Sequence, residues 1–188
     1  MNPFLEFRIT SPYGDRLSPI TNKKEKHTGV DLVISHQANI KSFTDGKCIF
    51  AGFAQAGTGI GGFGNTVLIE DKNRFVHLYG HLDSVTVKEN AQIKRGDVLG
   101  KQGNTGQSAG SHLHYEIREK NSPSYGWRTD VEPTQYLIDF YKNDIEELNN
   151  QNIEEIVNYL SVAWKNSKDE KEKNRIHQLA NILRLKKI

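Results

Sequence analysis

The sequence predicts a mainly β protein, an antiparallel sheet or barrel-sandwich core, with a C-terminal α-helical hairpin. Two observations lead to this fold class. All 16 glycines lie between Gly14 and Gly126, and all 5 prolines lie at or before Pro133. Glycine and proline mark turns, whereas their absence permits long helices. A turn-rich body is therefore expected up to Pro133 and helices after it.

Short apolar runs separated by glycine, asparagine or aspartate are typical of strands. Such runs predict strands at 29–34, 47–54, 66–69, 74–78, 85–87 and 112–118. Between them, the glycine-rich segment 57–64 predicts a loop, because so many glycines disfavour regular structure. A strand, not a helix, is expected after this loop, so it lacks the context of a phosphate-binding loop.

Beyond Pro133 the apolar residues recur at helical spacing. Asn152 can cap a helix whose apolar face comprises Ile153, Ile156, Val157, Leu160 and Trp164. After a break at 166–169, a second stripe comprises Ile176, Leu179, Ala180 and Leu183. Two short amphipathic helices are thus expected to form a hairpin and pack on each other or on the β body. Binding of a protein partner, or assembly, is the alternative role, and His177 is expected to be solvated.

Composition excludes several classes of function. A net charge of +2 without a dense basic stripe argues against nucleic acid binding. The single Cys48 excludes an internal disulfide framework and a cysteine zinc cluster, and it is expected to be a small buried residue. No apolar run is long enough to span a membrane. The start of the chain has no basic region followed by a long apolar stretch, so no signal peptide is expected.

Histidines and one carboxylate carry the chemical signal. His27 and Asp31 are four residues apart around Gly29, which lets the backbone turn so that both side chains converge. His112 and His114 alternate on one face of a predicted strand. Imidazole and carboxylate are ligands that Zn²⁺ prefers, and three of them leave a fourth position for water. The residues alone predict a zinc hydrolase of unspecified substrate, in which one histidine of the pair binds metal while the other serves as acid or base.

Several motifs occur together and in a characteristic order. They are His27–Leu32, Gly61–Ile69, Leu78–Leu82, Ile93–Gly100, Gly103–Ser108, His112–Glu116 and Glu132-Pro133. In this order the chain resembles the lysostaphin-like (LytM-type) zinc endopeptidases over roughly residues 8 to 137. The resemblance implies a mostly antiparallel β metallopeptidase core with a groove bounded by loops. It implies hydrolysis of peptide bonds in bacterial peptidoglycan, in the cross-bridge or the stem peptide.

Carried over position by position, the resemblance implies roles for five side chains. His27, Asp31 and His114 become the ligands of one Zn²⁺ per chain. His81 and His112 become the catalytic pair beside the metal. Because no H-E-x-x-H glutamate is present, one of these two histidines is expected to take the proton of the attacking water. One of them, protonated, stabilises the oxyanion or supplies the leaving amine.

The resemblance also divides the chain and suggests its setting. Residues 1–137 are expected to form the peptidase domain, and residues 138–188 a helical appendage outside the resemblance. A cell-wall hydrolase without a signal peptide suggests a bacteriophage lysin or virion tail component. An excised domain of a secreted protein is the alternative.

Departures from the family pattern affect loops and one further histidine. Residues 34–40 replace the usual small turn, and Ser111 stands where a proline often precedes the H-x-H. His77 lies outside the pattern. Alternation places His77, Tyr79 and His81 on one strand face, where His77 is expected to be an ordinary exposed histidine, with a groove-edge role as the alternative.

Two other functions compete with the hydrolase. A non-catalytic peptidoglycan-binding or regulatory domain could use the same fold, although degenerate members generally lose metal ligands and here all are retained. Residues 94–100 also resemble biotinyl and lipoyl carrier domains, with Asp71-Lys72 as the modified turn. The carrier hypothesis leaves His27, Asp31 and the H-x-H unexplained.

Overall fold

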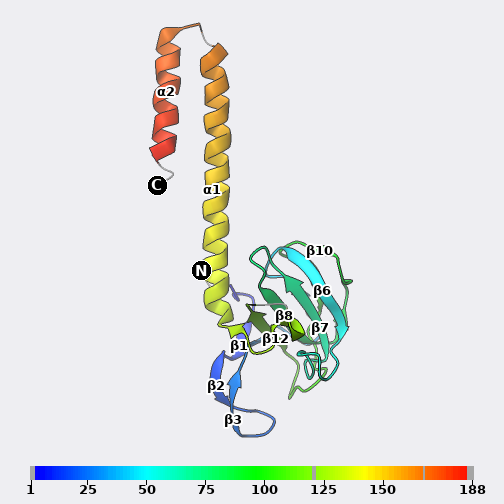
Figure 1. Ribbon diagram of the computed structural model, residues 1–188. Helices are drawn as coiled ribbons and strands as arrows, with labels where there is room; N and C mark the ends of the chain where they lie inside the picture. The colour runs from blue at the N-terminus through cyan, green and yellow to red at the C-terminus, as the bar shows by residue number, and fades with distance from the viewer. Residues whose placement is uncertain (1–2, 120–121, 167, 186–188) are drawn as a thin grey trace. The chain divides into compact units, whose positions relative to one another are not determined.

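The computed structural model describes residues 3–119, 122–166 and 168–185. The chain divides into two compact units at the boundary between Ile138 and Asp139. The first unit holds the strands and the second holds most of the helical residues (Figure 1).

The strands of the first unit are mostly short. They are β1 (Arg8–Ser11), β2 (Gly14–Leu17), β3 (Lys24–His27), β4 (Val30–Val33), β5 (Asn39–Lys41), β6 (Gly46–Phe53), β7 (Asn65–Glu70), β8 (Val76–Leu82), β9 (Ser84–Val85), β10 (Gln92–Ile93), β11 (Val98–Lys101), β12 (Leu113–Arg118) and β13 (Asp130–Val131). A 3₁₀ turn covers Ser124–Gly126.

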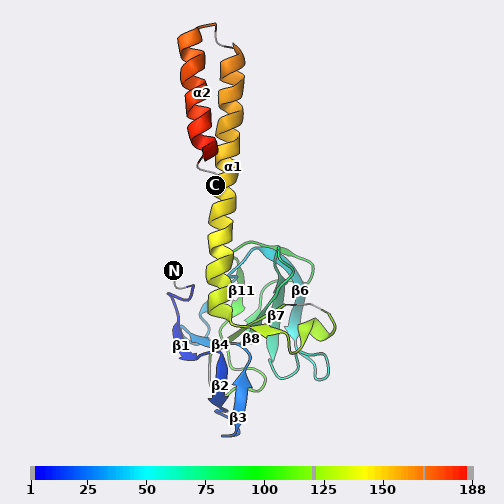
Figure 2. The ribbon, with the colours of Figure 1, turned by 60° about the vertical axis from the view of Figure 1, so that its left-hand side comes forward.

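The main sheet has the strand order β1-β4-β12-β8-β7-β6-β10, with β13 also paired to β12. A second sheet has the order β5-β11-β9, and β2 and β3 form a separate hairpin that extends from the β1 edge (Figures 1 and 2). Every strand pair in the described residues is antiparallel. The predicted mainly antiparallel β fold is therefore confirmed.

Strands β8 and β12 lie at the centre of the main sheet and are buried along their whole length. Tyr115 pairs with Tyr79, and His114 pairs with Gly80. Because side chains alternate, the two tyrosines lie on one face and His114 lies on the other. Aromatic rings fill the tyrosine face, where Tyr115 contacts Phe43 at a centroid distance of 4.6 Å. The sheet thus has an aromatic face and a face that carries the histidine.

The predicted strands are present, with shifted ends, as β4, β6, β7, β8, β9 and β12. Segment 57–64 consists of turns, as predicted. The polar strands were missed because their sequences do not alternate: β3 reads Lys-Glu-Lys-His and belongs to a solvent-exposed hairpin. Short edge strands of this kind obtain their conformation from pairing rather than from apolar pattern.

Helix α1 (Pro133–Asn166) is one continuous helix of 34 residues, so the predicted helix start at Asn152 is wrong. The helix begins at Pro133, a residue favoured at the first helical position. The Glu132 carboxylate accepts hydrogen bonds from the backbone N–H groups of Thr134 and Gln135, at 3.0 and 2.7 Å. With its start capped in this way and no glycine or proline after it, the helix continues through Asn152.

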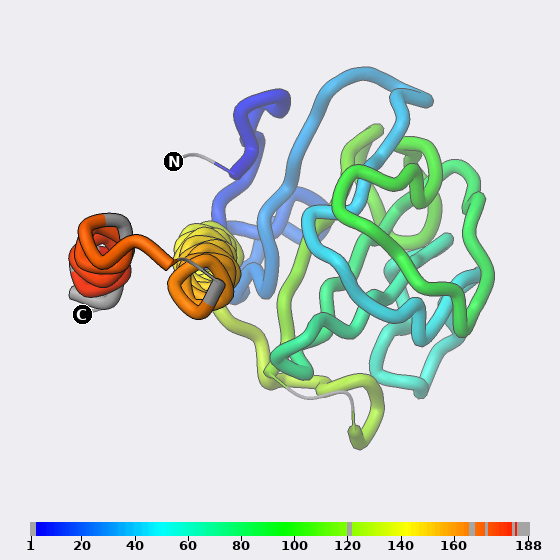
Figure 3. Tube along the Cα trace, turned by 90° about the horizontal axis from the view of Figure 1, so that it is seen from above, coloured from blue at the N-terminus to red at the C-terminus, as the bar shows by residue number. Residues whose placement is uncertain are grey.

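Helix α2 (Glu170–Leu185) follows a short connection, of which Ser167 lies outside the described residues. The Asp169 carboxylate accepts a hydrogen bond from the N–H of Lys171 at 2.8 Å and so caps α2. In the second unit α1 and α2 run side by side as a hairpin (Figures 1 and 3). His177 is exposed, as predicted. Among the described residues, neither helix is both long and apolar enough to cross a membrane.

His77 is completely buried, which corrects the prediction of an exposed histidine. Its Nε2 lies 3.1 Å from Asp71 Oδ2 and its Nδ1 lies 2.6 Å from the Tyr115 hydroxyl. The Tyr136 hydroxyl, at the start of α1, donates a hydrogen bond of 2.5 Å to the same Asp71 oxygen. A buried carboxylate needs such partners, because an unpaired charge in a protein interior is costly. His77 therefore has a structural role, and the groove-edge alternative does not hold.

Replacing Tyr136 with phenylalanine should destabilise the first unit. The substitution removes one donor from the buried Asp71 carboxylate, and hydrogen bonds to charged groups contribute about 1–3 kcal/mol. Urea denaturation followed by near-ultraviolet circular dichroism measures the loss. The matched control is Tyr159→Phe, at a side chain that is 74% exposed, which should leave the free energy of unfolding unchanged. Equal midpoints for all three proteins would contradict the role of this hydrogen bond.

Candidate metal centre

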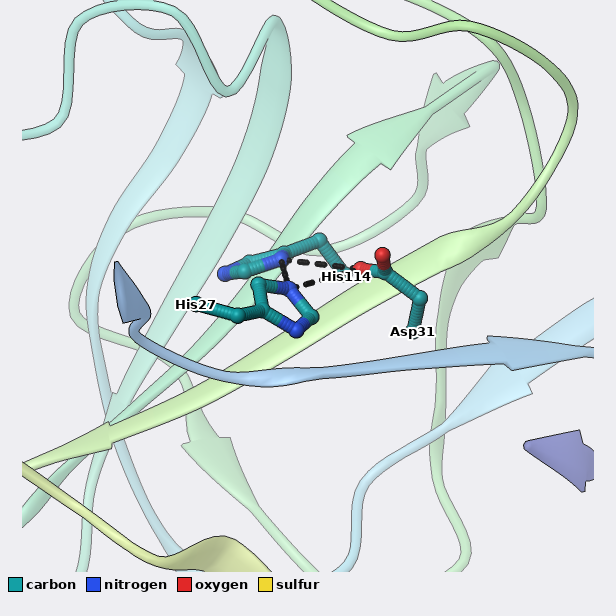
Figure 4. A group of neighbouring side chains, drawn as sticks. All are labelled: His27, Asp31 and His114. Atoms are coloured by element: carbon teal, nitrogen blue, oxygen red, sulfur yellow. Dashed lines mark hydrogen bonds and ion pairs between the residues drawn. The ribbon is translucent and has the colours of Figure 1, made fainter. Parts of the chain in front are cut away.

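Three side chains from three strands converge on one point (Figure 4). His27 is the last residue of β3, Asp31 lies in β4, and His114 lies in β12. Asp31 and His114 are direct partners across the antiparallel pair of β4 and β12, so their side chains share one face of the sheet. All three are buried.

The ligand atoms of these residues form a nearly equilateral triangle. His27 Nε2, His114 Nδ1 and Asp31 Oδ1 lie 3.1 Å from one another on each side. In a tetrahedral zinc site with ligands at about 2.0–2.1 Å, neighbouring ligand atoms are about 3.3–3.4 Å apart. The triangle is therefore close to the size that a zinc ion requires, and its donor set of two imidazoles and one carboxylate is one that zinc prefers.

Hydrogen bonds to the second nitrogen of each ring leave the other nitrogen free to bind a metal. His27 Nδ1 lies 2.8 Å from the carbonyl oxygen of Pro12, and a carbonyl oxygen only accepts. The proton is therefore on Nδ1, and Nε2 has a free lone pair. His114 Nε2 lies 3.2 Å from Glu116 Oε2, so the same reasoning frees its Nδ1. Contacts of this kind fix the tautomer and orientation of metal-binding histidines.

Glu116 and Arg118 extend this arrangement along β12, and sequence reasoning assigned neither of them a role. Glu116 also accepts hydrogen bonds from Thr28 Oγ1 and from Arg118 Nε, each of 2.5 Å. Arg118 Nη1 donates to the carbonyl oxygen of Gly59 in the glycine-rich loop at 3.0 Å. The signal was present in the sequence, because the alternation of His112 and His114 continues with Glu116 and Arg118 on the same face.

Charges in the centre shift two pKa values in opposite directions. Burial acts to raise the pKa of Asp31, but hydrogen bonds with three histidines outweigh it and hold this pKa well below its usual range. Burial acts to lower the pKa of His114, but its hydrogen bonds with Asp31 and Glu116 raise it overall. A metal ion would take the place of the His114 proton, so protons and metal compete for this ring.

His81 lies beside the triangle because of an unusual backbone conformation. Its φ is +60°, in the left-handed region, and the pairing of β7 with β8 shifts register at this point. The His81 ring therefore lies 4.8 Å from the His112 ring, on the face of His114. The expectation that His77, Tyr79 and His81 share a face is wrong, because regular alternation ends at His81.

The polar contacts of His81 define its tautomer. Its Nδ1 lies 2.8 Å from the carbonyl oxygen of Thr105, so Nδ1 carries a proton and Nε2 does not. Burial and the neighbouring His114 and His112 lower the pKa of His81 to about 4. Without a metal ion the ring is therefore neutral at neutral pH.

His112 stands on the other side of the triangle. Its Nδ1 lies 2.7 Å from the carbonyl oxygen of Gly110, and its Nε2 lies 3.4 Å from Asp31 Oδ1. In His112, as in His81, Nδ1 contacts a backbone carbonyl oxygen, and Nε2 points away from that oxygen. The segment before His112 is held by Gln102, whose Nε2 donates to the Ser111 carbonyl oxygen at 3.2 Å. This contact stabilises the backbone at Ser111, the position where a proline often precedes the H-x-H.

Two residues of the triangle, Asp31 and His114, form part of the wall of an open groove with a volume of about 490 Å³. Residues from the β1 edge, the β2–β3 hairpin and the 107–111 loop make up its walls. The lining comprises Arg8, Thr10, Ser11, Arg16, Leu17, Pro19, Ile20, Asp31, Val33, His81, Gln107, Ser108, Ala109, Gly110, Ser111, His112 and His114. Asp31 and His114 can therefore be reached from solvent through this groove.

The family model described as "Peptidase family M23" matches residues 25–125. A curated relative, the DD-carboxypeptidase/endopeptidase Mpg of Neisseria meningitidis, is 36% identical over 65% of this chain and 27% of its own length. The peptidoglycan DD-endopeptidase ShyA of Vibrio cholerae is 28% identical over 67% of this chain and 28% of its own length. The chain therefore spans just over a quarter of these relatives.

Among solved structures, the catalytic domain of lysostaphin from Staphylococcus simulans, an antimicrobial peptidase, is similar in fold. The TM-score is 0.59 and the sequence identity is 26%. The superposition covers 70% of this chain and 92% of that domain. The similarity thus concerns most of the first unit and nearly all of the catalytic domain.

Replacing Gly29 with alanine should weaken zinc binding without removing a ligand. A Cβ at this position would lie 2.4 Å from the Tyr115 carbonyl oxygen and 2.8 Å from His114 Nε2, so the ring must move. Disturbing an outer contact of a ligand costs about 10- to 100-fold in metal affinity. Competition with a chromophoric chelator measures the change.

Gly110→Ala is the matched control for that substitution. A Cβ on Gly110 would meet no heavy atom within 4 Å, so zinc affinity should stay at the wild-type value. Wild-type affinity in Gly29→Ala as well would contradict the tight packing of the His114 ring.

Proposed function

The chain belongs to peptidase family M23, and from this premise we propose that it is a zinc-dependent endopeptidase acting on peptide bonds of bacterial peptidoglycan, in the cross-bridge or the stem peptide. One observation carries the proposal: three ligand atoms lie 3.1 Å apart, and two of their residues, Asp31 and His114, line a groove together with His81 and His112. The DD-endopeptidase names of the relatives support this substrate class.

Zinc is the metal of this family, and the donor atoms suit it. His27, Asp31 and His114 would hold the ion and leave a fourth position for water or substrate, the arrangement of catalytic zinc sites. A bound zinc ion supplies Lewis acidity at a carbonyl oxygen and an acidified water. Cys48 is buried within β6, so its thiol does not compete with the two histidines and the aspartate for the metal.

In the proposed mechanism, His81 and His112 move the protons. Each ring has Nδ1 bonded to a backbone carbonyl oxygen, which leaves Nε2 to exchange a proton with the attacking water or the leaving amine. The Thr105 carbonyl and the Gly110 carbonyl hold these rings in orientation. A protonated ring at either position also stabilises negative charge that develops on the carbonyl oxygen of the substrate.

A non-catalytic binding domain is a less favoured function. A binding domain has no use for a triangle of buried ligand atoms flanked by two oriented histidines. The carrier hypothesis requires the Asp71-Lys72 turn as a modification site. However, the Asp71 carboxylate is buried and accepts hydrogen bonds from Asn73 and Phe75, so it stabilises its own turn.

The domain assignment and the setting are also proposals. Residues 1–137 would form the peptidase domain, and residues 138–188 an appendage whose binding of a protein partner or role in assembly stays a prediction. The bacteriophage lysin or virion tail setting, with a secreted protein as the alternative, also stays a prediction. Cell-wall peptidoglycan is the proposed place of action in either setting.

Substitution of two histidines separates metal binding from proton transfer. His114→Ala should abolish both zinc retention and activity, because it removes a ligand. His81→Ala should retain zinc but lose about 10²- to 10⁴-fold in rate, the usual contribution of a general acid or base. Zinc content is measured by mass spectrometry of the metal, and activity by the release of fragments from defined muropeptides.

The exposed His177, in the second unit, provides the control substitution His177→Ala. Zinc content and turnover of this variant should match the wild-type protein. A wild-type protein that holds no zinc, together with normal cleavage by His81→Ala, would exclude the proposed mechanism.

A further inference from the structure

Arg16 connects the β2–β3 hairpin to the metal centre. It lies in β2 and pairs across the hairpin with Glu25 of β3. Its Nε donates to Glu25 Oε1 at 2.9 Å, and its Nη1 donates to Asp31 Oδ2 at 2.9 Å and to Ser11 Oγ at 2.8 Å. The guanidinium therefore bridges two carboxylates, of which only Asp31 belongs to the ligand triangle.

The two oxygens of Asp31 have different partners. Oδ1 faces His27, His112 and His114, whereas Oδ2 accepts the hydrogen bond from Arg16. A carboxylate can bind a metal through one oxygen or through both. Because the guanidinium occupies Oδ2, it presents Oδ1 alone to the triangle. Charge-assisted hydrogen bonds of this kind are short and directional.

We propose that Arg16 is a positioning residue for the metal centre, which holds Asp31 as a one-oxygen ligand and ties the β2–β3 hairpin to the bound ion. The proposal rests on the zinc site proposed above. Arg16 lies outside residues 25–125, the part of the chain that the family model matches.

The hairpin contributes to the metal site and to the groove at the same time. His27, at the end of β3, supplies a ligand, and Arg16 holds a second ligand in β4. Leu17, Pro19 and Ile20 of the same hairpin line the groove. Through Arg16, the position of this groove wall is therefore coupled to the geometry of the ligand triangle.

Charge and orientation make opposite predictions for the loss of Arg16. A guanidinium near a divalent cation repels it, so electrostatics alone would give tighter zinc binding when the charge is removed. Positioning gives the reverse, because Asp31 Oδ2 loses its partner and the carboxylate can rotate. The sign of the change in zinc affinity therefore distinguishes the two effects.

The test measures zinc affinity of Arg16→Met by competition with a chromophoric chelator. We expect affinity to fall about 10- to 100-fold, the usual effect of removing an outer contact of a metal ligand. Arg16→Lys, which keeps one charged donor, should recover part of the loss. In the Co²⁺-loaded protein, Arg16→Met should also change the visible absorption spectrum, which reports coordination geometry.

Two control substitutions lie on the same hairpin. Glu25→Gln removes the ion pair within the hairpin but leaves the contact of Arg16 with Asp31. Lys26→Met removes the ion pair between a half-exposed lysine and Asp130, away from the ligand triangle. Both should bind zinc like the wild-type protein. Circular dichroism confirms that each variant is folded.

Unchanged or tighter zinc binding in folded Arg16→Met would overturn the proposal, as would an equal loss in Glu25→Gln. Both measurements use the metal alone, without substrate. Zinc binding that weakens as expected in a protein that cleaves no muropeptide would refute the proposed function and leave the role of Arg16 intact. A wild-type protein that binds no zinc would refute both.

Discussion

The carboxylate of Asp31 is the point on which the arrangement of the site depends. It contacts three imidazoles through one oxygen and a guanidinium through the other. A buried carboxylate with this many partners stays ionised, and it attracts cationic groups from segments far apart in the chain. The partners come from the β2–β3 hairpin and from residues 112–114 at the start of β12, and Asp31 itself lies in β4, so this one group draws three parts of the fold together.

Sheet register makes that convergence possible. Asp31 lies directly opposite His114 because β4 and β12 are antiparallel neighbours. A slip of one residue would move His114 to the aromatic face, since strand side chains alternate. The packing of Tyr79 and Tyr115 on that face stabilises the register. The apolar core and the metal centre are thus two faces of the same strand pairing.

Buried polar groups occur on both faces, and most of their polar atoms have hydrogen-bond partners, although Arg118 Nη2 has none among the described residues. Glu116 and Arg118 continue the metal side along β12, while Asp71, His77 and Tyr136 form a separate network on the aromatic side. Histidine serves in both places with different consequences. His77 is enclosed by donors and acceptors and has no access to solvent, whereas His81 lines the groove. Access to the groove, rather than residue type, distinguishes the position of His81 from that of His77.

Resemblance to a known family selected the three residues of the triangle, whereas the sequence patterns by themselves determined the mainly β body, the helical tail and four candidate ligands, His27, Asp31, His112 and His114. Local patterns carry this information, because glycine content, the four-residue spacing of His27 and Asp31, and alternation at His112 and His114 are all short-range. Only the tertiary structure decided the face of His81, the burial of His77 and the contact of Arg16. These depend on a left-handed backbone residue, on packing between distant segments and on pairing of a polar hairpin. No local pattern encodes such features, because each arises from neighbours that folding brings together.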